Sequence, residues 1–208
     1  MTDASMEHIE AHAAHDAHAA AKHEAQRIDN LKFGMWVFLA SEVVLFTVLI
    51  ATFLAWRVVN SELVHEVHEA TGIWLVSLNT FLLLASSFAM VMGLREIQKG
   101  NRGGLMKWIG LTALLGAVFV GLQAVEYSIL ASHGVTIYSS EFGMRFYAPT
   151  AMHGAHVIVG VIWALYIVNK TRRGSYSSQN YIGIEIFGLY WHFVDVVWII
   201  LFTVIYLL

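Results

Sequence analysis

The stretch YWHFVDVVWIILFTVIYLL, residues 190–208, decides the fold of this chain. It extends an apolar run that starts at Ile182, and the whole run is long enough to cross the roughly 30 Å hydrocarbon core of a bilayer as one helix. Within it, His192 and Asp195 stand three residues apart. An ionisable side chain costs roughly 2.5–3.5 kcal/mol at the bilayer centre on insertion scales, so both side chains need partners inside the protein. The nearest candidate partner of Asp195 is His192, one helical turn away, and we expect these two residues to pair.

Four more segments of the chain are similarly long and apolar. Apolar residues make up 58% of the 208 residues and charged residues only 13%, which is typical of an integral membrane protein. The segments are continuously apolar and do not alternate as barrel strands do, so we expect helices. We predict an all-α bundle of five transmembrane helices over residues 32–208, preceded by a His/Ala-rich tail at 1–31, with Pro149 at the start of the fourth helix. The expected helices span residues 33–56, 72–94, 105–130, 149–168 and 182–208.

The connections between these helices differ in charge. The second and fourth connections are basic, as is the tail, whereas the first and third are poor in Lys and Arg and contain several Glu residues. By the positive-inside rule the N-terminus is cytoplasmic and the C-terminus lies outside. The net charge of −3 argues against a nucleic-acid partner, because no large basic surface is present to neutralise phosphates. The basic residues of the two connections are Arg95, Lys99, Arg102, Lys107, Lys170, Arg172 and Arg173.

Most ionisable residues inside the predicted helices share helical faces. On such faces they should point into the bundle and form a polar framework between helices, bonding to one another and fixing the register. The second helix adds a seam of small residues at seven-residue intervals, which lets helices approach closely: Gly72, Asn79, Ser86 and Gly93. The framework residues are Glu126, His153, His156, Glu185, His192 and Asp195.

Glu42, in the middle of the first helix, stands apart from this framework. It has no ionisable neighbour within one helical turn. It must therefore pair with another helix, contact a lipid headgroup or water, or be protonated because of desolvation. A functional and a structural role are equally compatible with this pattern.

Two other interpretations of the histidines remain open at this point. His153 or His156 could bind a haem b together with His192, as in membrane-anchor cytochromes. Against this, His153 and His192 lie near the starts of helices that run in opposite directions, which places them at opposite faces of the membrane. In the tail, His8, His12, His15 and His18 would share a stripe on a helix and could bind a divalent metal, or they could belong to a partly disordered, solvated arm. No phosphate loop, nucleophile elbow or HExxH motif indicates an autonomous enzyme.

Several motifs resemble subunit III of the haem-copper oxidases, in its five-helix bacterial form. The run from Tyr190 is similar to that family's final helix, in which a Trp-His-Phe-x-Asp-Val-Val-Trp pattern is a signature. FYAPTAMHGAHVIVG, residues 146–160, is similar to the fourth-helix pattern Thr-Gly-x-His-Gly-x-His-Val, with Ala151 in place of the glycine. ASEVVLF at 40–46 resembles the stretch around the family's buried first-helix glutamate, and NTFLLLASS at 79–87 and GLQAVEY at 121–127 resemble its second and third helices. The resemblance extends from Phe33 to Leu208.

The resemblance implies a non-catalytic subunit of a proton-pumping terminal oxidase that reduces oxygen to water. It implies that this chain binds no cofactor and that haem and copper lie in partner subunits. In the family, subunit III packs on subunit I, within a complex that contains subunit II and in some cases a small subunit IV. It holds phospholipids in a V-shaped cleft between its first two helices and the rest, and it supports proton uptake, oxygen access and turnover stability.

For individual residues, the resemblance implies that Glu42 is the membrane carboxyl group that faces subunit I. Arg57 and Arg95, at helix ends, would contact lipid headgroups. The expected location is the bacterial cytoplasmic membrane. We favour cytochrome c as the electron donor, with a quinol oxidase as the alternative.

Overall fold

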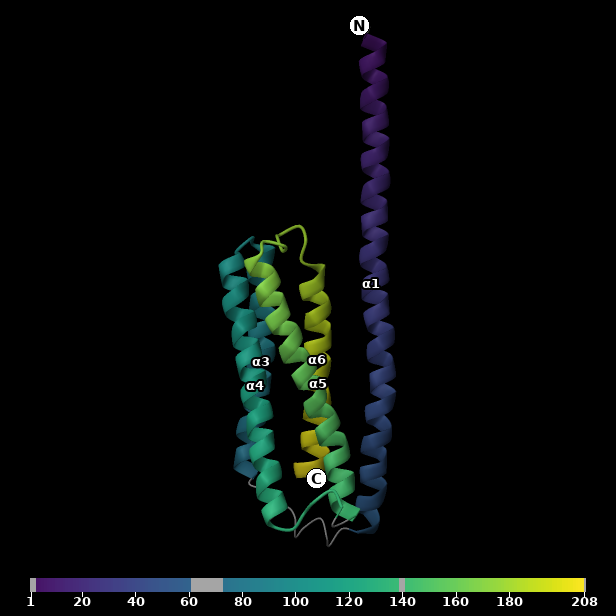
Figure 1. Cartoon of the computed structure of the whole chain (residues 1–208). Coiled ribbons are helices and arrows are strands. Elements are labelled where there is room, and N and C mark those ends of the chain that lie inside the picture. The colour runs from purple at the N-terminus through teal and green to yellow at the C-terminus, as the bar shows by residue number, and fades with distance from the viewer. Residues whose placement is uncertain (1–2, 61–72, 139–140, 208) are drawn as a thin grey trace. The chain divides into compact units, whose positions relative to one another are not determined.

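The computed structural model describes residues 3–60, 73–138 and 141–207, and the side chains of all of these except 3–14, 17 and 141. Within this described part, five helices are long and apolar enough to span a membrane, which confirms the all-α membrane fold (Figure 1). The last helix ends in a π-helical turn, η1. The elements are α1 (Asp3–Val59), α3 (Ile73–Gln98), α4 (Arg102–Ser132), α5 (Glu141–Arg172), α6 (Ile182–Phe202) and η1 (Thr203–Leu207).

The fourth predicted helix is longer than its apolar pattern indicated. It begins at Glu141 instead of Pro149, so that Pro149 lies inside α5 and our placement of this residue at the helix start was wrong. Apolar length predicts the part of a helix that lies in hydrocarbon, whereas the helix itself continues beyond it. Pro149 has no N–H to donate to the carbonyl four residues earlier. The adjacent Thr150 donates its hydroxyl to Phe146 O at 2.7 Å, one of the ways in which membrane helices accommodate proline.

Residues 3–31, which we expected to form a tail, are the first part of the same helix α1. The chain forms two compact units, residues 1–38 and 39–208, and each is described by itself. The predicted boundary at residues 31 and 32 falls inside α1 and stays a prediction.

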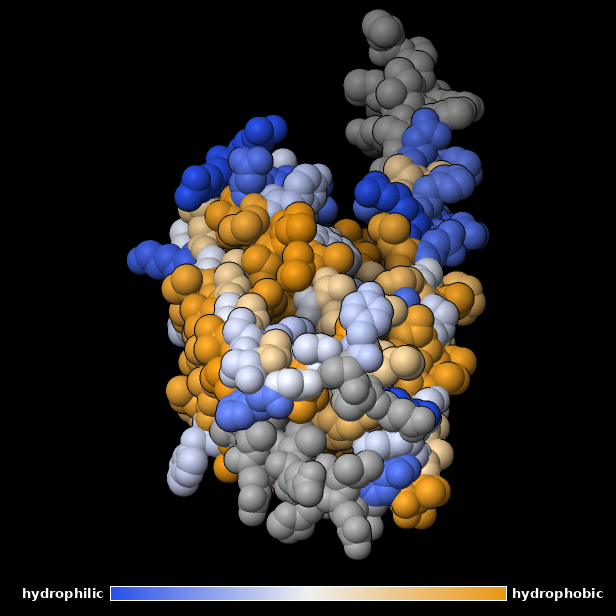
Figure 2. Space-filling model, turned by 60° about the horizontal axis from the view of Figure 1, so that its bottom comes forward, coloured by the Kyte–Doolittle hydropathy of each residue, from blue (hydrophilic) through white to orange (hydrophobic). Residues whose placement is uncertain are grey.

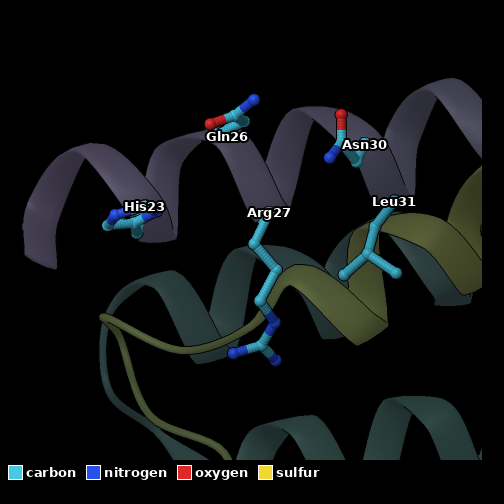
Figure 3. Close-up of a pocket in the computed structure, with 5 residues that line it drawn as sticks. All are labelled: His23, Gln26, Arg27, Asn30 and Leu31. Atoms are coloured by element: carbon cyan, nitrogen blue, oxygen red, sulfur yellow. The ribbon is translucent and has the colours of Figure 1, made fainter.

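The first unit exposes most of its described side chains to the surroundings. Arg27 Nη1 donates to Glu24 Oε2, one turn earlier, at 3.2 Å. A shallow hollow runs along this part of α1, and in Figure 3 Arg27 and Leu31 extend to the same side of the helix. Because all of its lining residues lie on one exposed helix, the hollow is a surface feature of α1. They are His23, Gln26, Arg27, Asn30 and Leu31.

In the second unit, α3, α4, α5 and α6 form a four-helix bundle. Both α3 and α5 pack against the same two helices, α4 and α6. The ring of Phe119 on α4 meets Trp198 of α6 edge-on, with the ring centroids 4.8 Å apart. Both side chains are almost fully buried, so the centre of the bundle is aromatic.

Trp191 of α6 occupies a slot between two glycines. A Cβ at Gly116 of α4 would lie 2.7 Å from the Trp191 ring, and a Cβ at Gly160 of α5 would collide with the same ring. On the α3 side, Trp191 Nε1 donates to Ser86 Oγ at 3.0 Å. Ser86 belongs to the predicted small-residue seam, whose described members Asn79, Ser86 and Gly93 are all buried on α3, while Gly72 lies outside the described residues.

Residues 39–59 of α1, which belong to the second unit, lie beside α5 and α6 (Figure 1). Leu39, Phe46 and Phe53 follow one another at seven-residue intervals and are buried. Phe46 meets Phe193 of α6 at 6.3 Å between ring centroids, and Phe53 meets Phe142 of α5 at 6.4 Å.

The position of α3 corrects the cleft that the resemblance implied. Because α3 packs against α4 and α6, the first two membrane helices do not stand apart from the other three as a pair. The bundle presents a broad apolar surface, shown in orange in Figure 2, and its exposed residues on α3 include Trp74, Phe81 and Phe88. This surface suits a surrounding of lipid tails or other membrane helices.

Replacement of Gly160 by Val should destabilise the bundle, because the added side chain collides with Trp191. Overpacking of this kind costs about 1–3 kcal/mol. Gly154→Val on the same helix is the matched control, since a Cβ at Gly154 meets no atom within 4 Å. Thermal unfolding of the detergent-solubilised protein should show a clear loss for Gly160→Val alone. Equal losses for the two variants would contradict the slot.

Candidate functional site

Glu42 lies on the buried seam of α1, between Leu39 and Phe46. The spacing of this seam alternates three and four residues, which turns the Glu42 side chain toward the same neighbours as the two apolar residues. Its side chain is 15% exposed, and its Oε2 lies 3.1 Å from Nε2 of His156 on α5. Of the alternatives considered for Glu42, the structure therefore gives it a partner on another helix.

His156 is held in place from several sides. Its Nδ1 lies 2.8 Å from Met152 O, and its own backbone carbonyl accepts a hydrogen bond from Tyr190 Oη at 2.9 Å. The edge of the Phe46 ring closes the site, with 5.2 Å between ring centroids. Because a backbone carbonyl can only accept, Nδ1 must carry a hydrogen, which leaves Nε2 for Glu42.

The Glu42–His156 contact therefore holds one shared proton. With Nδ1 protonated, a hydrogen bond between Nε2 and the carboxyl group needs one further proton, on either partner. Neutral imidazole with a carboxylic acid and imidazolium with a carboxylate both satisfy the contact, and both have no net charge. A pair of this kind can lie in an apolar surrounding at much lower cost than a lone carboxylate.

His153, one turn earlier on α5, lies in the aromatic core of the bundle. It is fully buried, and its ring stacks on Trp198 at 4.9 Å between centroids and meets the edge of Phe119 at 5.7 Å. The two histidines of α5 thus separate in role, because His153 belongs to the bundle core and His156 to the contact with α1.

The expected direct pair of His192 and Asp195 was wrong. Ser87 of α3 is the residue that His192 contacts: its Oγ is 2.6 Å from His192 Nδ1, and it also lies beside Asp195. The side chains of Asp195 and His192 both point from α6 toward α3, so they approach Ser87 on that helix and do not pair with each other. Ser87 thereby links the two residues across the α3–α6 contact.

Near the end of the chain, two polar residues bind the π-helical turn η1. Tyr206 Oη donates to Glu126 Oε1 on α4 at 2.7 Å, and both side chains are buried. Arg57, at the end of α1, donates Nη1 to Val204 O at 2.7 Å. Glu126 therefore takes part in a link between helices, and at least one Arg57 donor is used within the protein.

The two remaining predicted residues lie at helix ends. Glu185 is in the first turn of α6, where the helix dipole favours an acidic residue. Arg95 is in the last turn of α3 and is exposed. Neither is brought together with Glu42.

The three membrane histidines face three different partners, which does not fit a haem held between two of them. His153 faces Trp198, His156 uses both ring nitrogens on Glu42 and Met152, and His192 binds Ser87. In the tail, the His15 and His18 side chains are exposed, whereas those of His8 and His12 lie outside the described ones. Across the described residues, no group of three or more His, Asp or Glu side chains is placed to hold a metal ion.

Sequence reasoning missed Ser87 and Tyr206. Tyr206 follows Asp195 by eleven residues, close to three helical turns, so on the predicted helix 182–208 it falls on the same face as Asp195 and could have been found from its spacing. Ser87 sits beside the small-residue seam of α3, and nothing in its own surroundings along the chain indicates a partner on α6.

Known proteins match this chain over almost its whole length. Residues 5–208 match the family described as cytochrome c oxidase subunit III. The chain is 38% identical to quinol oxidase subunit 3 of Bacillus spizizenii over 205 residues, which is 98% of each protein. It is 37% identical to cytochrome c oxidase subunit 3 of Thermostichus vulcanus, over 91% of this chain and 92% of that protein. It is 39% identical to cytochrome c oxidase subunit 3 of Bacillus subtilis, over 86% of each.

The Glu42–His156 contact can be measured with a double-mutant cycle of Glu42→Ala and His156→Ala. Charged hydrogen bonds contribute about 1.5–3 kcal/mol, whereas hydrogen bonds in membranes average about 0.6 kcal/mol, so we expect a coupling of about 1–2 kcal/mol in the free energy of unfolding. Glu42→Ala combined with Ser128→Ala, whose exposed hydroxyl binds only its own helix, should show almost no coupling. Equal values for the two cycles would mean that Glu42 and His156 do not act as a pair.

Replacement of Ser87 by Ala should destabilise the α3–α6 contact. The variant removes the hydroxyl from both His192 and Asp195, and unsatisfied buried groups cost about 1–3 kcal/mol each. Ser128→Ala again serves as the control and should change stability by less than about 0.5 kcal/mol. A Ser87→Ala protein with the thermal midpoint of the unmodified chain would show that the serine does not link the two residues.

Proposed function

The chain belongs to the cytochrome c oxidase subunit III family, and we propose that it works as the accessory subunit III of a proton-pumping haem-copper terminal oxidase, most directly a cytochrome c oxidase. In this role it belongs to an oxidoreductase complex of aerobic respiration, and the redox metals lie in its partner subunits. The observation that supports an accessory role best is the use of the buried ionisable residues. Those with described partners hydrogen-bond to groups on neighbouring helices, as a framework requires.

Subunit I is the main partner that we propose, with subunit II and a small subunit IV in the same complex. The exposed apolar faces of the bundle suit packing against other membrane helices as well as lipid. On α1 the face opposite the buried seam is itself apolar, with Val43, Val44 and Val48 exposed. A helix that uses only one seam within its own chain has a second face available for a partner.

We place the protein in a bacterial cytoplasmic membrane with its N-terminus inside. The ends of α3 and α5 and the start of α4 carry most of the basic residues of the bundle, including Arg95, Arg102 and Lys170. These three helix ends lie together at one end of the bundle (Figure 1), which the positive-inside rule assigns to the cytoplasm. The relatives named above are bacterial.

Glu42 is the functional membrane carboxyl group in this proposal. Together with His156 it keeps one proton within the membrane at the contact between α1 and α5, close to the face of α1 that a partner would cover. Loss of the carboxyl group would loosen this contact and reduce the support that the subunit gives to proton uptake and turnover. Arg95, which is exposed at a helix end, is the better candidate for a phospholipid headgroup, since Arg57 already binds a carbonyl.

A quinol oxidase is the second candidate. The Bacillus spizizenii relative with that name matches 98% of both chains, a coverage as complete as any reported above. The two candidates share the fold and the accessory role and differ in the electron donor, which other subunits bind.

Purification of the native membrane complex through a tag on this chain tests the proposal. We expect a large haem-containing subunit to co-purify, and its reduced-minus-oxidised spectrum should stay with the partners after this chain is stripped away. The class of subunit II, identified by mass, would then separate a cytochrome c oxidase from a quinol oxidase. Haem retained by the stripped chain would contradict an accessory role and favour a membrane cytochrome.

Glu42→Gln should leave the haem content of the complex unchanged and shorten its active lifetime. A loss of about 1 kcal/mol corresponds to roughly fivefold in a rate constant, so inactivation during turnover should be several-fold faster. Glu24→Gln, an exposed position on the same helix, is the matched control and should behave as the unmodified complex. If both variants keep the normal lifetime and proton uptake, Glu42 has only a structural role.

A further inference from the structure

The centre of the four-helix bundle contains a layer of polar atoms without hydrogen-bond partners. Among the described residues, five buried side-chain nitrogen or oxygen atoms have none, and four of them belong to just three residues. These four are Asn79 Oδ1 on α3, Gln123 Oε1 on α4, and both ring nitrogens of His153 on α5. Buried polar atoms in folded proteins are almost always satisfied by protein or by ordered water. A group of unsatisfied atoms from three helices therefore points to a bound ligand.

Contacts around Phe119 bring the three residues into one layer. Asn79 Nδ2 donates to the Phe119 carbonyl at 3.2 Å, and the Phe119 ring meets the His153 ring at 5.7 Å between centroids. Gln123 follows Phe119 by one helical turn, and helical side chains lean back toward the preceding turn. The Gln123 amide thus lies on the side of α4 that faces Asn79 of α3 and His153 of α5.

The orientation of the Gln123 amide follows from its neighbours. Nε2 of Gln123 donates to Tyr127 Oη at 3.4 Å. Nε2 is therefore the Gln123 atom that faces Tyr127, and Oε1 is left as an unsatisfied acceptor.

The Asn79 amide is oriented by the same reasoning. Its partner is the carbonyl of Phe119, which can only accept, so the nitrogen of the amide must face it. Oδ1 of Asn79 is then a second unsatisfied acceptor.

The three residues together have too few hydrogens for their acceptors. Neutral His153 offers one N–H and one acceptor nitrogen, to which the two amide oxygens add two more acceptors. One donor cannot satisfy three acceptors. A water molecule brings two hydrogens and accepts one hydrogen bond, so it satisfies the His153 N–H and both amide oxygens and leaves the second ring nitrogen as the one remaining acceptor.

We propose that Asn79, Gln123 and His153 form a binding site for ordered water within the membrane-spanning bundle. A single water molecule there accepts from the His153 N–H and donates to the amide oxygens of Asn79 and Gln123. Three hydrogen bonds are what buried waters typically make. The aromatic walls of the site are Trp198, on which His153 stacks, and the edge of Phe119.

This inference does not depend on the proposed function, because it uses only contacts inside the bundle. Its meaning for the fold is that α3, α4 and α5 are joined through a shared water at the depth where Trp198 joins α6 to α3. His153 is then a residue that positions water in the core.

The first test is a structure of the intact complex at a resolution that shows ordered water. We expect density at hydrogen-bonding distance from one ring nitrogen of His153 and from at least one of the two amide oxygens. Direct hydrogen bonds from His153 to Gln123 or Asn79, with no density between them, would overturn the proposal. So would density too large for water, which would indicate a different ligand.

A second test uses variants in the same complex. His153→Phe keeps a flat ring against Trp198 and removes both ring nitrogens, and Gln123→Met removes one acceptor at similar volume. Each should abolish or displace the water density, whereas Gln98→Met at the exposed end of α3 should leave it unchanged. Density that persists at the same place in both core variants would overturn the assignment of its ligands.

If a core variant does not assemble, a measurement on the unmodified complex keeps the test open. Solid-state NMR with ¹⁵N-histidine detects magnetisation transfer from water to ring nitrogens. A fully buried His153 should receive early transfer if water is bound beside it. A buried imidazole signal that receives none, while the exposed histidines do, would contradict the proposal.

Discussion

Water is absent from the hydrocarbon core of a membrane, and this constraint determines which side chains hold the bundle together. The indole N–H of Trp191 is given to Ser86, and that of Trp198 to Thr80, both on α3. Each hydroxyl then passes its own hydrogen to a carbonyl of α3, Leu83 O or Val76 O. Because each donor in these two series of hydrogen bonds has its own acceptor, α6 fits α3 in a single register. Packing alone would distinguish neighbouring registers far less sharply, since apolar side chains have no directional requirement.

The same constraint explains why α1 differs from the other helices. Its seam consists mainly of Leu39, Phe46 and Phe53, which could pack against many apolar surfaces. Glu42 and His156 provide the directional contact that such a seam lacks. The pair is neutral as a whole, so it can lie between helices without a counter-charge, and its separation would leave two polar groups unsatisfied.

The sequence predicted the helices well and their partners poorly, and the reason differs from case to case. Continuous apolar runs identify spans because length and hydropathy are local properties. Helix ends were missed, as at Glu141, because a helix continues past the hydrocarbon boundary once it has formed. The pairing of Asp195 with His192 failed because Ser87 approaches from another helix, and contacts between helices are not encoded in spacing along one of them. His156 and Glu126 do lie at contacts between helices, and the polar framework as a whole stays a prediction.

The glycine slot and the polar contacts depend on each other. Gly116 and Gly160 leave room for the Trp191 ring beside α4 and α5, and the Nε1 of the same ring donates to Ser86 on α3. The α3–α6 bundle is thus joined by a large ring and a hydrogen bond, whereas α1 is joined by one apolar seam, the Glu42–His156 pair and the hydrogen bond from Arg57 to Val204 O. A change of environment at the outer face of α1 would therefore act first on Glu42 and His156 and leave the bundle core intact. The Glu42–His156 pair is thus a contact through which a partner on α1 could alter the subunit without unfolding it.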